Sequence, residues 1–152
     1  MIWIKEISPK ARFIVPMSDS GVSATPYDSI GGEAAVRRVV DRFYDLMESE
    51  PGYAALRAMH APDLAPMRGS LAGFLTGWLG GPRRWFEENV GVCVMSAHAV
   101  LPIDAETARQ WTDAMARALS ESGVDADLAA RMNDAFERMA GGMARMAANR
   151  NN

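Results

Sequence analysis

Residues 36–47 read VRRVVDRFYDLM. The apolar side chains of this stretch return at i, i+3, i+4, i+7 and i+11, which places them on one face of an α-helix. We predict a helix that begins near Gly31-Gly32 and ends at Pro51-Gly52, because such pairs interrupt helices. Tyr44 lies near this stripe in the helical repeat, so it also points inward. The predicted buried face holds Val36, Val39, Val40, Phe43 and Met47.

The segment that follows is expected to contain shorter helices. A helical piece is predicted over residues 53–60 and a longer helix over residues 66–79, with proline tolerated in its first turn and Gly80-Gly81-Pro82 as its stop. One or two helical turns are expected around Trp85-Phe86. An unusually apolar stretch comes next, at residues 92–95.

Two long helices are predicted for the last third of the chain. Asp104 and Asp125 are good N-cap residues, and Gly123 separates the two helices. The predicted fold class is therefore all-α. The inward stripes of these helices are Ala108, Trp111, Met115, Ala118 and Leu119 in the first, and Leu128, Met132, Phe136, Met139, Met143 and Met146 in the second.

Length and composition exclude several classes of protein. The chain has 152 residues, enough for one domain with a real core. Its single cysteine cannot form an internal disulfide or a four-cysteine zinc site. A net charge of −3 disfavours a nucleic-acid partner. No apolar run is long enough for a membrane span and no secretory signal is evident, so a cytoplasmic location is expected.

The chain divides into three parts. Residues 1–25 are interpreted as an N-terminal extension that is either a poorly ordered arm or a segment packed on the domain or on a neighbouring subunit. Residues 26–148 form the predicted domain. Residues 149–152 are a polar tail that is expected to fray.

A few side chains could carry chemistry. His98 lies in an apolar neighbourhood, where it is either a hydrogen-bonded core residue or a ligand; a haem needs only one such imidazole. Tyr44 and Trp111 lie on predicted inward faces, where each either bonds a backbone carbonyl or donates toward a ligand in a shared cavity. His60 could simply be a surface or capping residue, and Cys93 a small buried hydrophobe.

Taken together, these residues resemble a truncated haemoglobin over residues 26–146. The resemblance lies in Tyr27-Asp28-Ser29-Ile30-Gly31-Gly32-Glu33, then Asp41-Arg42-Phe43-Tyr44-Asp45-Leu46-Met47, Leu56-Arg57-Ala58-Met59-His60 and Phe74-Leu75-Thr76-Gly77-Trp78-Leu79-Gly80-Gly81-Pro82. It continues at His98, which Pro102-Ile103 follow, and at Trp111, thirteen residues beyond the histidine. That tryptophan indicates group II, the O-type truncated haemoglobins.

The resemblance implies a two-over-two helical sandwich around one haem b. His98 then matches the proximal ligand of a five-coordinate iron. Tyr44 and Trp111 match the distal donors to dioxygen or another diatomic ligand, and His60 matches a polar distal position. The haem-packing residues that it implies are Met67, Leu71, Phe74, Leu75, Trp85, Met95, Leu101, Ile103 and Met115.

The sequence departs from the family at two positions that usually contact the haem propionates. Ala97 and Ser70 stand where relatives have basic residues, so the propionates depend on Arg68, Arg83 or Arg84, or on hydroxyl groups and water. Three interpretations stay open. In the first, the chain binds dioxygen and other diatomic ligands, and an unknown reductase supplies the electrons for oxygenase- or peroxidase-like chemistry. In the second, it is a sensor or interaction module whose ligand state alters the N-terminal arm or the apolar stretch 92–96, which could face a partner subunit in a homodimer. In the third, it kept the fold and lost the haem.

Overall fold

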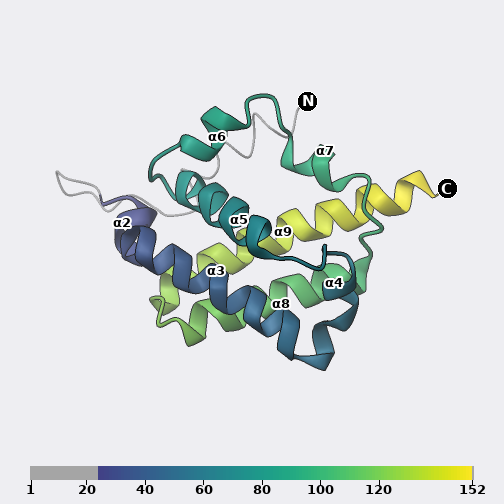
Figure 1. Cartoon of the computed structure of the whole chain (residues 1–152), viewed down its shortest axis with the longest axis horizontal. Coiled ribbons are helices and arrows are strands. Elements are labelled where there is room, and N and C mark those ends of the chain that lie inside the picture. Colours follow the sequence, from purple (N-terminus) through teal and green to yellow (C-terminus); the bar gives the residue numbers. More distant parts are fainter. Residues whose placement is uncertain (1–23, 152) are drawn as a thin grey trace.

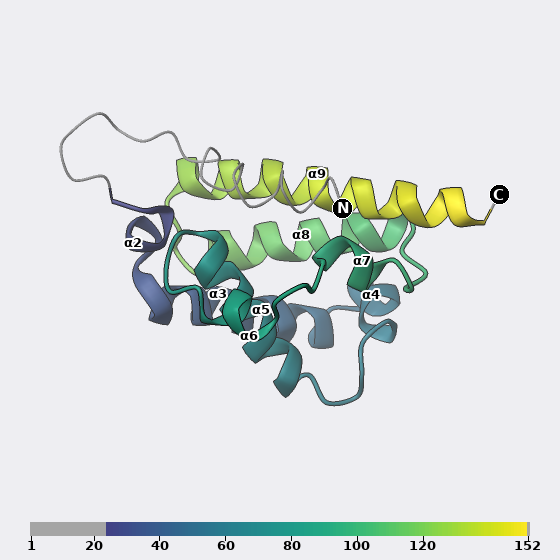
Figure 2. The ribbon, with the colours of Figure 1, turned by 90° about the horizontal axis from the view of Figure 1, so that it is seen from above.

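The computed structural model describes residues 24–151, and this part of the chain is built from helices without a strand (Figure 1). Its long helices form two pairs. Helix α3 (Gly32–Ser49) packs against α5 (Ala65–Trp78), and α8 (Ala105–Glu121) packs against α9 (Ala126–Arg150). Figure 2 shows α8 and α9 side by side and antiparallel in one layer, with α3 and α5 in the other. The all-α, two-over-two prediction is confirmed.

The capping residues predicted from the sequence begin the two helices of the second layer. The Asp104 carboxylate accepts from the Thr107 backbone N–H at 2.8 Å, and the Thr107 hydroxyl oxygen accepts from the Asp104 N–H at 3.0 Å. This reciprocal capping box satisfies backbone groups at the start of α8. The Asp125 carboxylate similarly accepts from the Asp127 and Leu128 N–H groups of α9, both at 3.1 Å.

Short helices connect the layers, and several differ from the sequence prediction. The piece predicted at residues 53–60 is a 3₁₀ turn, η1 (Pro51–Tyr53), followed by α4 (Ala54–Ala58). Helix α6 (Arg84–Glu88) confirms the turn expected around Trp85-Phe86. Two one-turn helices were not predicted: α2 (Pro26–Ile30), which the Thr25 side chain caps, and α7 (Val94–His98), which carries His98.

The ends of the chain are only partly described. Helix α9 continues to Arg150, so Asn149 and Arg150 of the predicted polar tail are helical. Residues 1–23 lie outside the described residues, and with them nearly all of the predicted N-terminal arm. No helix in the range 24–151 has the length and apolar character needed to cross a membrane.

The core lies between the two layers. Phe43 and Met47 of α3 are almost completely buried, as their helical spacing predicts. Trp78 of α5 stacks on Phe136 of α9, with 5.2 Å between ring centroids. Aromatic pairs of this kind contribute about 0.5–1.5 kcal/mol beyond the area that they bury. This contact therefore helps to hold α5 of one layer against α9 of the other.

Two glycines of α5 allow α6 to lie close against it. A Cβ atom at Gly77 would come within 2.6 Å of the Phe86 ring, and one at Gly73 within 3.1 Å of Trp85. A Cβ atom at Gly69, on the same helix, would meet open space. Glycine is thus required at residue 77 by the approach of α6, whereas glycine at residue 69 only weakens the helix.

This difference predicts opposite effects of the same substitution within one helix. Gly69→Ala should stabilise the protein by about 0.5–1 kcal/mol, because alanine loses less backbone entropy in a helix. Gly77→Ala should destabilise it by about 1–3 kcal/mol, because the added methyl group must displace Phe86. Chemical denaturation of the two variants measures both values. Equal stabilisation by both substitutions would contradict the packing of α6 on α5.

Candidate functional site

A cavity of about 550 Å³ lies among helices of both layers, with walls from α3, α4, α5, α6, α7, α8 and α9. This volume is in the usual range of about 300–1,000 Å³ for small-molecule and cofactor sites. The lining contains no Lys, Arg, Asp or Glu among the described residues. Its polar groups are few, and four of them are Tyr44, His60, His98 and Trp111. The cavity is therefore an apolar, uncharged site with a small set of hydrogen-bonding groups.

Most of the predicted site residues meet in this cavity. The structure brings into its wall Tyr44, His60, Met67, Leu71, Phe74, Leu75, Trp85, His98, Leu101, Ile103 and Trp111. Met95 and Met115 are exceptions. Both are buried, with 3% and 0% of their surface exposed, yet neither lines the cavity. Met115 instead packs within the main core, because its position on α8 turns it away from the cavity.

Some lining residues were not singled out from the sequence. Phe136, Met139, Ala140 and Met143 of α9 form one side of the wall. Their spacing of i, i+3, i+4 and i+7 is the signal that marks a shared helix face. Sequence periodicity identified this face as buried, but it could not show that the face meets a cavity rather than a packed core.

His98 is oriented by its own helix. Its Nδ1 lies 2.6 Å from the carbonyl oxygen of Val94, one turn earlier in α7. A carbonyl oxygen can only accept, so Nδ1 carries the donated proton. In the neutral form of such a ring, Nε2 has a lone pair that can bind a metal. This is the arrangement in which a histidine binds a metal through Nε2, with the other nitrogen held by a backbone carbonyl.

His60 is held in the same way at the other histidine position of the wall. Its Nδ1 lies 2.9 Å from the Leu56 carbonyl oxygen, and its ring meets the Tyr44 ring edge-on at 6.1 Å. Burial lowers the pKa of His60, although the bond to Leu56 opposes this shift; the nearby Arg57 and His98 lower the pKa further. The ring is thus neutral near pH 7, with Nε2 as a hydrogen-bond acceptor.

Tyr44 and Trp111 bring two hydrogen-bond donors to the cavity. Among the described residues, neither the Tyr44 hydroxyl nor the Trp111 indole N–H has a hydrogen-bond partner. Both rings are fixed by Phe43, with centroids at 5.0 Å from Tyr44 and 5.3 Å from Trp111. Burial raises the pKa of Tyr44 to about 12, so its hydroxyl keeps its proton and can donate. Buried Tyr and Trp usually find partners, and here a cavity occupant could be that partner.

One edge of the cavity carries a small polar cluster. The Trp85 indole N–H donates to the Ser70 hydroxyl at 3.0 Å, and the Asn89 side-chain amide donates to the Trp85 carbonyl at 2.7 Å. The arginines considered as propionate partners do not line the cavity. Arg68 bonds to carboxylates of α3, and Arg83 lies over the Phe86 ring at 4.9 Å. Among the described residues, this edge of the cavity presents neutral hydrogen-bonding groups and no arginine.

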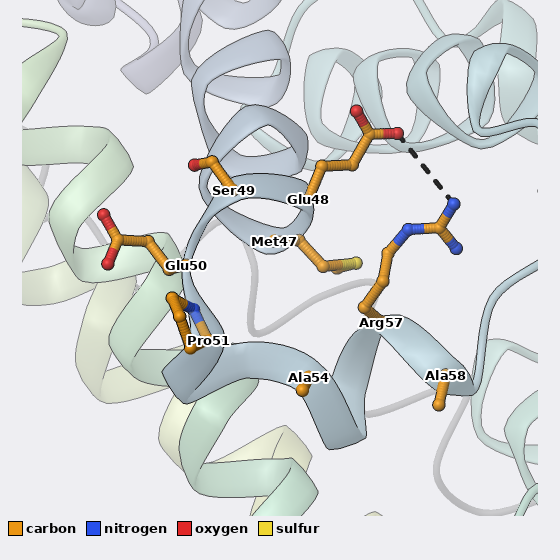
Figure 3. A pocket seen from close by; sticks show the side chains of 8 residues that line it. All are labelled: Met47, Glu48, Ser49, Glu50, Pro51, Ala54, Arg57 and Ala58. Atoms are coloured by element: carbon orange, nitrogen blue, oxygen red, sulfur yellow. Dashed lines mark ion pairs between the residues drawn. The ribbon is translucent and has the colours of Figure 1, made fainter.

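A second hollow, shown in Figure 3, is a different kind of surface. It lies where α3 meets η1 and α4, and its side chains include Glu48, Glu50 and Arg57. Arg57 and Glu48 form an ion pair at 3.9 Å across it. This hollow is open, and its lining has charged side chains and no histidine. We therefore interpret it as part of the charged surface and not as a ligand site.

Comparison with known proteins agrees with this geometry. Residues 25–145 match the model of the bacterial-like globins. The chain belongs to the bacterial-like globin family. This globin is 31% identical to the group 2 truncated hemoglobin YjbI of Bacillus subtilis over 103 residues, which cover 68% of this chain and 75% of that protein. The predicted relationship to group II truncated haemoglobins is thereby confirmed.

Solved structures share the fold of this globin. The group II 2-on-2 hemoglobin of Agrobacterium tumefaciens superposes with a TM-score of 0.77 at 35% identity, covering 84% of this chain and 97% of that one. A truncated oxygen-avid haemoglobin from Bacillus subtilis has a TM-score of 0.72 at 29% identity, covering 79% of this chain and 98% of that one. These structures span the same helical sandwich that surrounds the cavity.

Proposed function

We propose that this globin binds haem in the cavity and uses it to bind dioxygen and other diatomic ligands. The observation that carries the proposal is the state of His98. Its Nδ1 proton is committed to the Val94 carbonyl, and its ring belongs to the wall of an uncharged, apolar cavity. Its Nε2 is therefore the group that would hold the iron. The haem would supply an iron centre that can bind small diatomic ligands.

The apolar wall suits the flat, apolar body of a haem. Leu71, Phe74 and Leu75 from α5, with Met139 and Met143 from α9, provide aliphatic, aromatic and thioether surface. Such side chains exclude water from the site, and methionine adapts to an irregular ligand surface. The two carboxylates of a haem would lie at the edge formed by Ser70, Trp85 and Asn89, where hydroxyl, amide and solvent take the place of a cation.

Tyr44 and Trp111 would supply the hydrogen bonds that favour dioxygen at this site. A bound dioxygen carries partial negative charge, so a neutral N–H or O–H that points at it forms a charge-assisted hydrogen bond. Neither donor has a hydrogen-bond partner within residues 24–151, so neither loses a bond to that part of the chain when a ligand enters. The relative described as oxygen-avid supports tight holding of dioxygen as the activity of this globin. His60 is neutral and its ring lies beside the Tyr44 ring, so its Nε2 can accept a hydrogen bond on the same side of the cavity as the Tyr44 hydroxyl.

Absorption spectroscopy of the full chain during titration with haem tests the proposal. We expect a Soret band that saturates at one haem per chain, and a shift of that band when carbon monoxide is added to the reduced protein. The ferrous protein should be five-coordinate before the gas is added. Titration without a saturable Soret band would contradict haem binding and would favour a globin fold that has lost its cofactor.

A further inference from the structure

The outer side of Tyr44 is covered by an arginine that does not line the cavity. Arg68 of α5 reaches across to α3, where its Nη1 donates to the Asp41 carbonyl oxygen at 3.0 Å and to the Asp41 carboxylate at 3.1 Å. Its Nη2 donates to the Asp45 carboxylate at 2.7 Å. The two aspartates are one helical turn apart, so the guanidinium bridges them along the surface of α3.

Tyr44 lies within this bridge. It is three residues after Asp41 and directly before Asp45, and the guanidinium carbon of Arg68 is 5.6 Å from the centre of its ring. That distance is within the range of a cation–π contact. The ring meets Phe43 and His60 edge-on, with centroids at 5.0 and 6.1 Å. Its position is therefore set by two aromatic neighbours and one fixed cation.

We propose that Arg68 is a positioning residue for Tyr44: bound to Asp41 and Asp45, it holds the tyrosine ring so that the hydroxyl faces the cavity. The inference rests on the proposed role of Tyr44 as a donor to the bound ligand. The ion pairs of Arg68 are partly exposed, with 24% of the arginine side chain accessible, so their direct contribution to stability is small. Their consequence is geometric, because three hydrogen bonds to α3 leave the planar guanidinium little freedom to rotate.

The charge of Arg68 also acts on the Tyr44 hydroxyl. Burial raises the pKa of Tyr44, and the nearby positive charge of Arg68 opposes that rise. A cation close to a phenol favours its ionised form and hence makes the neutral O–H a better donor. Lysine would keep the charge but not the planar, two-point contact that holds the cation over the ring.

The chain contains a matched control in Arg117. This arginine lies 6.0 Å from the centre of the Tyr53 ring and pairs with two carboxylates, Glu50 at 3.5 Å and Glu121 at 3.4 Å. Tyr53 does not line the cavity. Arg117 also donates to the Tyr53 hydroxyl at 3.4 Å, a bond that Arg68 does not make to Tyr44. Arg117→Met therefore removes an arginine from beside a tyrosine ring at a place remote from the site, and it serves as the control for loss of a surface cation.

The first test is nuclear magnetic resonance of the full chain labelled with ¹³C at tyrosine Cζ. Near one pH unit below the pKa of about 12, about a tenth of the Tyr44 phenol is ionised, and its Cζ resonance begins to shift. Arg68→Met should move this onset to higher pH, and Arg68→Lys should move it by less. Arg117→Met should leave the Tyr44 resonance unchanged. An unchanged onset in Arg68→Met would overturn the proposal.

The second test is the dissociation rate of dioxygen from the haem-loaded protein, measured in a double-mutant cycle. Arg68→Met should raise the rate about threefold to tenfold when Tyr44 is present, and by less than about twofold in the Tyr44→Phe background. The same increase in both backgrounds would show that Arg68 does not act through Tyr44. A shifted Tyr44 resonance combined with an unchanged rate in Tyr44→Phe would instead count against Tyr44 as a ligand donor, while supporting its contact with Arg68.

Discussion

Replacement of His98 by glycine is expected to abolish stable haem binding. His98 lies in the cavity wall, where its Nδ1–H donates to a backbone carbonyl and its Nε2 is left to bind a metal. No other residue of α7 has an imidazole. Loss of an outer partner of a metal ligand commonly costs about tenfold to a hundredfold in affinity, so loss of the ligand itself should cost at least about a hundredfold. The loss of haem affinity is measured by mixing the haem-loaded variant with apomyoglobin and following haem transfer by the change in Soret absorbance.

Two further measurements make this prediction specific to His98. Added imidazole should restore the Soret band in His98→Gly, because it can enter the space left by the ring and supply the missing nitrogen. His60→Gly should retain haem, since His60 is expected to act on the ligand side. If His60→Gly loses haem and His98→Gly keeps it, then the two histidines have the reverse roles.

Tyr44→Phe and Trp111→Phe should each raise the dissociation rate of dioxygen from the haem-loaded protein. Each substitution removes one donor of the cavity wall while keeping an aromatic ring beside Phe43. A hydrogen bond to a group that carries charge contributes about 1.5–3 kcal/mol. At about 1.4 kcal/mol per factor of ten, each variant should release dioxygen about tenfold to a hundredfold faster. Stopped-flow measurement of dioxygen release gives these rates.

A matched substitution outside the cavity separates this effect from general damage. Tyr53→Phe removes the hydroxyl of a buried tyrosine that bonds to Asp113. Tyr53 does not line the cavity, so this variant should not change the dissociation rate by more than about twofold. Rates that remain at the wild-type value in both Tyr44→Phe and Trp111→Phe would remove these residues as donors.

Local pattern in the sequence was sufficient to predict the long helices. The stripe from Val36 to Met47 predicted the buried face of α3, and Asp104 and Asp125 predicted the starts of α8 and α9. These features depend on neighbours within one or two turns, so they can be read from spacing alone. The short helix α7 could not, because its five residues show too little of a repeat to be distinguished from a turn.

Local sequence pattern was not sufficient to predict which residues line the cavity. The resemblance to truncated haemoglobins, rather than periodicity, brought Tyr44, His98 and Trp111 together as one candidate site. Periodicity placed Met115 and Met139 equally well on inward faces. The structure puts Met139 in the cavity wall and Met115 in the packed core, because the direction of an inward face matters only once the facing helix is known.

Spacing along the chain was thus enough to predict the long helices, their order and the side-chain types available to a site. The packing of the helices was needed to show which side chains share a cavity, and that Arg68 pairs with Asp41 and Asp45 instead of lining that cavity. The physical reason is the range of the interactions. Helix formation depends on contacts within a few residues, whereas the cavity and the Arg68 contacts depend on packing between segments far apart in the chain.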